Sequence, residues 1–215
     1  MDVQKGVTVV IPTLQRYSLT TAVSSVLLEK DVVGVITIRG KCTPQQRNLG
    51  LAGVASDVVL FLDDDCVVDP GAISKAYQYM EENSLDALAP RISGGFASSP
   101  TKVFIGAGIF CRTEVAKAVS WDEGIRRGED LDFAWRLMDA GYAWKYWEGA
   151  TIYHIGEPRT PSVLKKDTGI SSLGRLKEKH AARFDWLVRH NSSVLGIKDT
   201  TKSRWKPIAE GEIAQ

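Results

Sequence analysis

Three consecutive carboxylates, Asp63, Asp64 and Asp65, follow directly on the apolar run 58–62. This run is short and rich in β-branched and aromatic residues, which predicts a buried strand. Adjacent acids repel one another at the edge of a core, and a divalent cation is the usual compensation, because Mg²⁺ and similar hard cations prefer carboxylate oxygens. The triplet therefore indicates a metal site close to bound phosphate, and a solvated acidic loop is the competing interpretation.

A second acidic cluster contains Glu129, Asp130 and Asp132, and it opens an expected helix. The helix dipole and the free N–H groups of a first turn favour anions there, so either a catalytic carboxylate or an ordinary cap fits the pattern. His154 ends a short apolar segment further along the chain. It is a candidate ligand, although a lone histidine is more often a hydrogen-bonded structural residue.

These side chains need a scaffold of alternating strands and helices. Strands are expected at 7–11 (ended by Pro12), 35–38, 58–62, 86–90, 103–111, 143–147 and 151–154. Helices are expected at 19–27, at 45–55, from an Asp69 cap and Pro70 through Met80, from Asp130 to a glycine cap at Gly141, and at 177–191. The alternation predicts an α/β fold with a mostly parallel sheet, whose strand ends are the usual ligand-binding edge.

Composition sets broader limits. The 215 residues are 44% hydrophobic and 25% charged, with a net charge of +1, so nothing global indicates nucleic-acid binding. Three widely spaced cysteines argue against a disulfide framework and fit a reducing cytosol. The first residues lack the form of a signal peptide, and no apolar run is long enough for a membrane span. We therefore expect a cytoplasmic protein, at most peripheral at a membrane.

Several short motifs occur in a recognisable order. They are Pro12-Thr13 with Arg16, Arg47-Asn48-x-Gly50, Asp63-Asp64-Asp65 after the apolar run, Trp121-Asp122-Glu123, Gly128-Glu129-Asp130-x-Asp132, Arg136-Leu137 with Gly141-Tyr142, and His154. Each motif is weak alone, but their order and spacing over residues 6–157 closely resemble the inverting glycosyltransferases of family 2. The resemblance implies the Rossmann-like GT-A fold and transfer of a sugar from a nucleotide-diphosphate donor to an acceptor hydroxyl. We expect the sugar to be a hexose.

The resemblance also implies roles for individual residues. The residues matching its nucleotide-sugar-binding positions are Pro12, Thr13, Arg16, Arg47, Asp63 and Asp64. Asp65 would bind the Mn²⁺ or Mg²⁺ that bridges the donor diphosphate, with Asp63 and His154 as further ligands. Asp130 matches the general base, and Glu129 would help to position the acceptor. Charge neutralisation on the diphosphate and one base for the acceptor hydroxyl are what such a transfer requires.

One feature departs from the family. The second strand of its members commonly ends in an acidic turn that binds the nucleobase of the donor. Here the strand ends in Ile38-Arg39-Gly40-Lys41-Cys42, without an acid. Three alternatives remain: a sugar nucleotidyltransferase, disfavoured because its glycine-rich loop after the first strand is missing; a non-catalytic nucleotide- or sugar-binding protein; and a retaining transferase. The sequence does not predict the donor sugar or the nucleobase of the donor. It also does not predict the acceptor (glycan, lipid or protein) or the oligomeric state.

Charge divides the chain into two parts. Residues 1–162 carry 16 Lys and Arg against 20 Asp and Glu, whereas residues 163–215 carry 11 against 6. We expect a donor-binding domain at 1–157, and a loop (156–175) and basic helix in a C-terminal extension at 158–215. The basic side chains Lys165, Lys166, Arg175, Lys177, Lys179, Arg183 and Arg189 surround the apolar Phe184, Trp186 and Leu187. This pattern fits either an acceptor- or membrane-binding surface or a solvated helix packed on the domain.

Overall fold

The computed structural model describes residues 3–14, 18–94, 107–156 and 169–185, apart from the side chains of 169–171 and 173. The strands are β1 (Gln4–Thr13), β2 (Val32–Arg39), β3 (Ser56–Leu62), β4 (Cys66–Val68), β5 (Ala87–Ser93), β6 (Gly108–Arg112) and β7 (Trp144–His154). The helices are α1 (Ser18–Leu27), α2 (Thr43–Ala52), α3 (Ala72–Glu82), α4 (Thr113–Val119), α5 (Glu129–Asp139) and α7 (Gly169–Lys179). No helix among these residues is both long and apolar enough to cross a bilayer.

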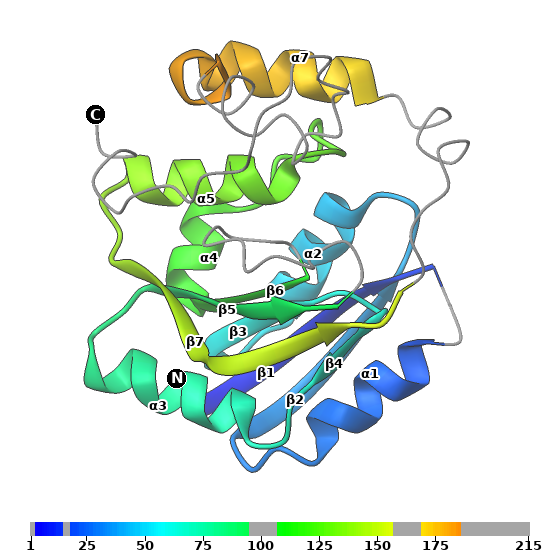
Figure 1. The fold of residues 1–215 in the computed structure, drawn as a ribbon, viewed down its shortest axis with the longest axis vertical. Coiled ribbons are helices and arrows are strands. Elements are labelled where there is room, and N and C mark those ends of the chain that lie inside the picture. The colour runs from blue at the N-terminus through cyan, green and yellow to red at the C-terminus, as the bar shows by residue number, and fades with distance from the viewer. Residues whose placement is uncertain (1–2, 15–17, 95–106, 157–168, 186–215) are drawn as a thin grey trace.

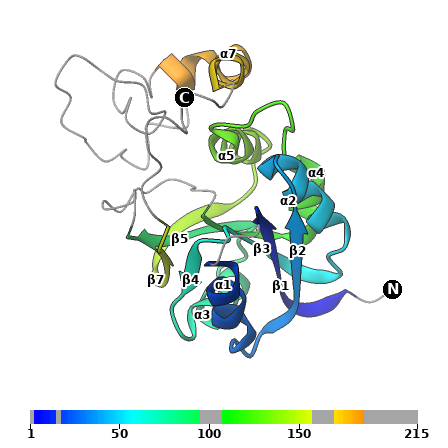
Figure 2. The same cartoon turned by 90° about the vertical axis from the view of Figure 1, so that its right-hand side faces the viewer.

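The strands form one sheet in the order β2-β1-β3-β6-β5-β7-β4. β1 is parallel to β2 and β3, and β5 is parallel to β7, while β6 and β4 run antiparallel to their neighbours. The sheet is therefore mostly parallel, as expected. Helices α1 and α3 cover one face, and α2, α4 and α5 cover the other (Figures 1 and 2). This is the GT-A arrangement.

Side-chain alternation along the central strands builds a core on each face of the sheet. Val9 packs with Val58 and Leu60 in the core beneath α1 and α3. Val10 and Phe61, their chain neighbours, pack in the core beneath α2 and α4. Successive side chains of a strand point to opposite faces, so a strand covered on both sides must be apolar at every position. This explains the continuous apolar runs in the sequence.

Several element boundaries differ from the expected ones. β1 continues through Pro12 to Thr13, whose carbonyl oxygen accepts a hydrogen bond from the Gly40 N–H. Pro12 has no N–H to donate, and it is tolerated because the pairing of β1 with β3 ends at Val10. The two closing strands expected at 143–147 and 151–154 are one strand, β7, with an irregular register opposite Pro90 and Arg91. Part of the expected strand at 103–111 lies outside the described residues, and the described strand is β6.

The C-terminal extension also differs from its prediction. The loop expected at 156–175 includes residues 169–175, which are the first part of α7. The basic helix expected at 177–191 therefore begins eight residues earlier (at 169 rather than 177), and a second short helical segment follows at 181–185. The first half of α7 contains glycine and serine residues that are typical of loops, so composition predicted a loop there.

Helix α3 begins at Ala72 rather than at Pro70, and its cap comes from a distant residue. Gly71, with φ of 77°, precedes the helix without a side-chain cap. The carboxylate of Glu29, which is 7% exposed, accepts hydrogen bonds from the N–H groups of Gly71, Ile73 and Ser74. An anion near a helix N-terminus satisfies its unpaired donors and its dipole.

We predict that Glu29→Ala lowers the free energy of unfolding by about 2–3 kcal/mol, because it leaves buried N–H donors without an acceptor. Urea denaturation measures the change. Glu82→Ala removes an exposed carboxylate from the other end of α3 and should cost less than about 0.5 kcal/mol. Equal losses for the two variants would contradict the capping role of Glu29.

Candidate active site

The carboxyl end of β3 places the three consecutive acids among three different sets of partners. Asp64 is 6% exposed and faces the end of β1, where its Oδ2 accepts hydrogen bonds from Thr13 Oγ1 at 2.6 Å and from the Leu14 N–H at 3.3 Å. Gln46 of α2 donates through Nε2 to the backbone oxygens of Thr13 and Ile38, which ties the ends of β1 and β2 together. Asp64 and Gln46 therefore fix the carboxyl end of β1. Pro12 lies buried in that strand end, and Arg16 lies outside the described residues.

Arg47 of α2 links the first acidic cluster to the second. Its side chain is 1% exposed, and Nη2 lies 2.9 Å from Asp63 Oδ1 while Nη1 lies 3.6 Å from Glu129 Oε1. The guanidinium carbon sits 4.3 Å from the ring centroid of Trp121. This ring in turn stacks on Phe133 of α5. A planar cation that is weakly hydrated suits such a buried, stacked position.

The two carboxyls paired with Arg47 are both harder to ionise than ordinary acids. Burial raises the pKa of Glu129 to about 7, the neighbouring Asp130 adds to the rise, and Arg47 opposes it. Burial likewise raises the pKa of Asp63, where Arg47 again opposes the shift and Asp65 adds to it. A carboxyl with a pKa near neutrality exchanges protons readily at physiological pH, as a general acid or base must.

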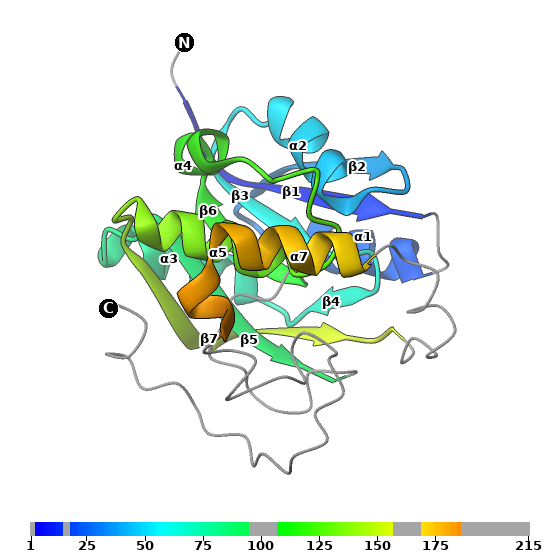
Figure 3. The same cartoon turned by 90° about the horizontal axis from the view of Figure 1, so that it is seen from above.

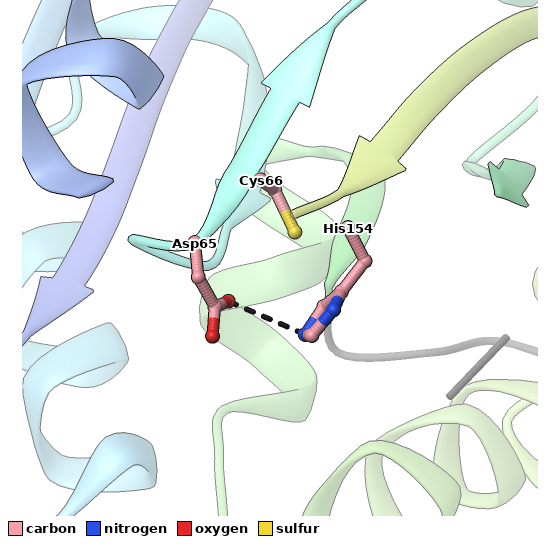
Figure 4. Close-up of side chains that lie close together, drawn as sticks. All are labelled: Asp65, Cys66 and His154. Atoms are coloured by element: carbon pink, nitrogen blue, oxygen red, sulfur yellow. Dashed lines mark ion pairs between the residues drawn. The ribbon is translucent and has the colours of Figure 1, made fainter. Parts of the chain in front are cut away.

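Asp65 and His154 meet where β4 pairs with β7. The antiparallel register places Cys66 opposite His154, and the Ile155 N–H donates to the Asp65 carbonyl oxygen at 2.8 Å. The side chains converge, with Asp65 Oδ1 3.4 Å from His154 Nε2, and Cys66 beside them (Figure 4). His154 Nδ1 is buried and has no hydrogen-bond partner among the described residues. A carboxylate and an imidazole so placed can both bind a divalent cation.

Cys66 is a poor third ligand for a hard cation. Burial raises the pKa of its thiol, and the charges of Asp63, Asp65 and Asp64 raise it further, so the thiol stays protonated. Gly156 matters more to the geometry, because a Cβ at that position would lie 2.4 Å from Asp65 Oδ2. The space that the carboxylate occupies thus depends on the missing side chain of Gly156.

Asp130 lies in the first turn of α5, where its Oδ1 accepts a hydrogen bond from the Leu131 N–H at 2.9 Å. The expected helix start is confirmed to within one residue, and Gly141, with φ of 78°, follows its last residues as expected. Asp132, the third acid, is fully buried and pairs with Arg136, Lys179 and His180. Its role is therefore structural.

Sequence reasoning missed several residues that shape the site. Asn48 exchanges hydrogen bonds with the backbone of Trp121 in both directions, at 2.9 and 2.8 Å, and so ties the 121–123 loop to α2. The sequence likewise gives no site role to Trp121, Gly156 or Lys179. The motif Trp121-Asp122-Glu123 was noted, but only the fold shows that its tryptophan supports Arg47.

Comparisons with known proteins find glycosyltransferases in sequence and in fold. Residues 29–105 match the family model "Glycosyl transferase family 2". A curated relative, "Pre-mycofactocin glycosyltransferase" of Mycobacterium tuberculosis, is 28% identical over 135 residues, covering 50% of this chain and 29% of that protein. The chain thus spans less than a third of the length of the curated relatives it matches.

Solved structures show the same fold at low sequence identity. GalNAc-T7, crystallised with UDP, GalNAc and Mn²⁺, superposes with a TM-score of 0.67 at 13% identity, over 89% of this chain and 52% of that chain. S. aureus TarS 1–349 in complex with UDP gives a TM-score of 0.57 at 16% identity, over 90% of this chain and 75% of that chain. Residues 29–105 are thus similar to glycosyltransferase family 2, the curated relative is a glycosyltransferase, and the solved structures show that the chain has the GT-A fold.

Proposed function

We propose that this chain transfers a sugar from a nucleotide-diphosphate donor to an acceptor hydroxyl, with a divalent metal and with inversion at the anomeric carbon. One observation carries the proposal: two acidic clusters from distant parts of the sequence meet at one end of the sheet. Asp63 and Glu129, one from each cluster, both contact the buried Arg47. A nucleotide donor and a hydroxyl acceptor need such a division between a metal-binding cluster and a base.

The residues at the end of β3 fit a divalent metal. Asp65 offers a carboxylate and His154 an imidazole whose Nε2 lies 3.4 Å from Asp65 Oδ1, while Gly156 leaves the space they need. We assign Asp65 and His154 as ligands, with Asp63 at the edge of the site. A bound Mn²⁺ or Mg²⁺ would neutralise charge on the departing diphosphate. The structural neighbour crystallised with UDP and Mn²⁺ supports this assignment.

The donor nucleotide would lie along the turn after β1, which Thr13 and Asp64 hold in place. Arg16, outside the described residues, remains part of this proposal through its motif. Arg47 contacts one acid of each cluster, Asp63 and Glu129, and its charge favours the ionised form of both. The complex of S. aureus TarS with UDP supports a uridine nucleotide as the first donor class to test.

The proton acceptor is one of the two acids that open α5. We propose Asp130 as the base that takes the proton of the acceptor hydroxyl, and Glu129 as the residue that positions the acceptor. Glu129 contacts Arg47, which restrains its carboxylate, and its raised pKa leaves it partly protonated at neutral pH. A protonated Glu129 carboxyl can donate a hydrogen bond to the acceptor, and Asp130 beside it would take the proton of the acceptor hydroxyl.

The proposal is tested by donor turnover with water as the acceptor. UDP-, GDP- and dTDP-sugars are incubated with the full chain and Mn²⁺, and the released nucleotide is measured with and without EDTA. We expect EDTA-sensitive release from one donor class, and NMR of the freed sugar shows whether its anomeric configuration is inverted. Binding of a nucleotide without release from any donor would instead favour a non-catalytic binding protein, and retained configuration would favour a retaining transferase.

We predict that Asp65→Ala abolishes Mn²⁺-dependent UDP binding in calorimetric titrations. Gly156→Ala should weaken the same binding by about 10–100-fold, the usual effect of disturbing the groups around a metal ligand, because its Cβ displaces the Asp65 carboxylate. Gly174→Ala is the matched control, since nothing lies within 4 Å of a Cβ there. Wild-type affinity in either Asp65→Ala or Gly156→Ala would contradict the metal assignment.

We predict that Asp130→Asn lowers donor turnover by about 10²–10⁴-fold, the range for loss of a general base, while UDP affinity stays unchanged. Asparagine retains the shape and the capping ability of the side chain, so helix α5 should remain intact. Kinetics of nucleotide release measure the effect. If Glu129→Gln shows this loss and Asp130→Asn does not, the two roles must be exchanged.

We predict that Glu129 makes the metal-free protein less stable as the pH rises from about 4.5 to about 7. In this window the unfolded chain has released the Glu129 proton and the folded chain still binds it, so unfolding becomes easier with increasing pH. Glu129→Gln cannot titrate, and its stability relative to wild type should increase across the window by on the order of 3 kcal/mol. Urea denaturation at pH 4 and pH 8 measures this. With the exposed Glu82→Gln as the charge-removal control, a pH-independent difference for Glu129→Gln would refute the prediction.

A further inference from the structure

Helix α7 lies over α5, on the side of α5 that faces away from the sheet (Figures 1 and 2). Seen from above, α7 runs along α5 (Figure 3). Leu176 and Phe184 from this region pack with Ile125, Leu131 and Trp135 in a small core of their own. Ser172, which is buried, accepts a hydrogen bond through its Oγ from the Arg126 N–H. The extension is thus joined to the segment that leads into the candidate base.

Lys179, the last residue of α7, connects the two ends of that segment. Its Nζ lies 2.9 Å from Asp122 Oδ2 and 2.6 Å from Asp132 Oδ1. The segment between these two aspartates, 123–131, contains both Glu129 and Asp130. One ammonium group therefore holds the two ends of the segment 123–131 close together.

Neighbouring side chains reinforce both ends of this bridge. Arg175 donates to Asp122 Oδ2 from Nε and Nη2, each at 3.1 Å. His180 Nε2 lies 3.0 Å from Asp132 Oδ1, and Arg136 binds the other oxygen. These contacts lower the pKa of both aspartates although burial opposes the shift, so both remain ionised.

The burial of Asp132 makes the bridge more than a surface ion pair. Its side chain is 0% exposed, and removal of one partner from a buried charge is strongly unfavourable. At the other end of the segment, Trp121 is tied to Asn48 and supports Arg47. A shift of Asp122 would therefore also disturb the surroundings of Glu129.

We propose that Lys179 is a positioning residue for the proposed transfer reaction: by bridging Asp122 and Asp132 it fixes the segment that carries Glu129 and Asp130. This inference rests on the proposed function. It also gives the extension a role within the active site, because its described Lys and Arg side chains pair with carboxylates of the same chain: Arg175, Lys177, Lys179 and Arg183. Lys165, Lys166 and Arg189 lie outside the described residues.

The test compares two substitutions of the same chemical kind. Lys179→Met removes the bridging charge and keeps the aliphatic stem. Arg183→Met is the matched control, because Arg183 binds Asp139 and the Trp135 carbonyl at the far end of α5, away from the segment 123–131. Lys179→Arg restores a cation that can reach both aspartates. Each full-length variant is examined by hydrogen exchange, by UDP binding with Mn²⁺, and by nucleotide release from the donor that wild type uses.

For Lys179→Met we expect faster exchange in 123–131 with unchanged exchange in β3. We also expect a fall in kcat of about 10–10²-fold, the effect of a small misplacement of reacting groups, with KM and UDP affinity within about twofold of wild type. Lys179→Arg should keep the wild-type exchange in 123–131 and the wild-type kcat, and Arg183→Met should change neither.

The proposal is overturned if Lys179→Met matches Arg183→Met in exchange and in kcat. It is also overturned if the fall in kcat equals the loss of folded protein, since a purely structural role predicts that proportion. Failure of the proposed function itself looks different: wild type then releases no nucleotide, while hydrogen exchange still decides whether Lys179 fixes the segment.

Discussion

The buried guanidinium of Arg47 is the contact on which the arrangement of the acids depends. Asp63, Asp65, Glu129 and Asp130 crowd toward one end of the sheet, and each would raise the free energy of its ionised neighbours. Arg47 compensates from inside the protein by pairing with Asp63 at the end of β3 and with Glu129 at the start of α5. Its flat face rests on Trp121. One residue of α2 thereby joins the first half of the chain to the second.

Strand directions explain why the remaining residues arrive at the same edge. The carboxyl ends of β1 and β3 lie together because these strands are parallel. β4 reverses direction directly after the acids and pairs antiparallel with β7, which returns the chain to place His154 beside Asp65. The edge therefore contains the end of β1 with Thr13, three acids and an imidazole, although these residues are separated by up to about 140 positions of sequence. Lys179 of the extension binds Asp122 and Asp132, which flank the segment that carries Glu129 and Asp130.

The features that the sequence predicted are those with strong local signals. The apolar run before Asp63 and the helical stripe after Asp130 determine β3 and α5 almost regardless of context. The mostly parallel sheet follows from their alternation. The proximity of Asp65 and His154 could be expected only from the family resemblance, because β4 is three residues long and leaves no periodic pattern.

The features that escaped prediction depend on tertiary contacts. Glu29 caps a helix more than 40 residues away, and no local motif indicates this partnership. Gly156 looks like an ordinary loop glycine until the Asp65 carboxylate is seen in the space a Cβ would fill. The basic residues of α7 fit either an external partner or a helix packed on the domain, and only the structure shows that Arg175 and Lys179 pair with an acid of the same chain, because charge patterning gives the sign of a surface but not its occupant.

The central claim is that the acids at the end of β3 bind a divalent metal together with the donor diphosphate. Electron–nuclear double resonance of Mn²⁺ with UDP and the full chain tests it most directly, because ³¹P and ¹⁴N couplings report phosphate and imidazole bound to one ion. The account predicts both couplings in one protein-bound species of the wild-type chain, and loss of that species in Asp65→Ala. A Mn²⁺–UDP spectrum that is the same with and without the protein would contradict it.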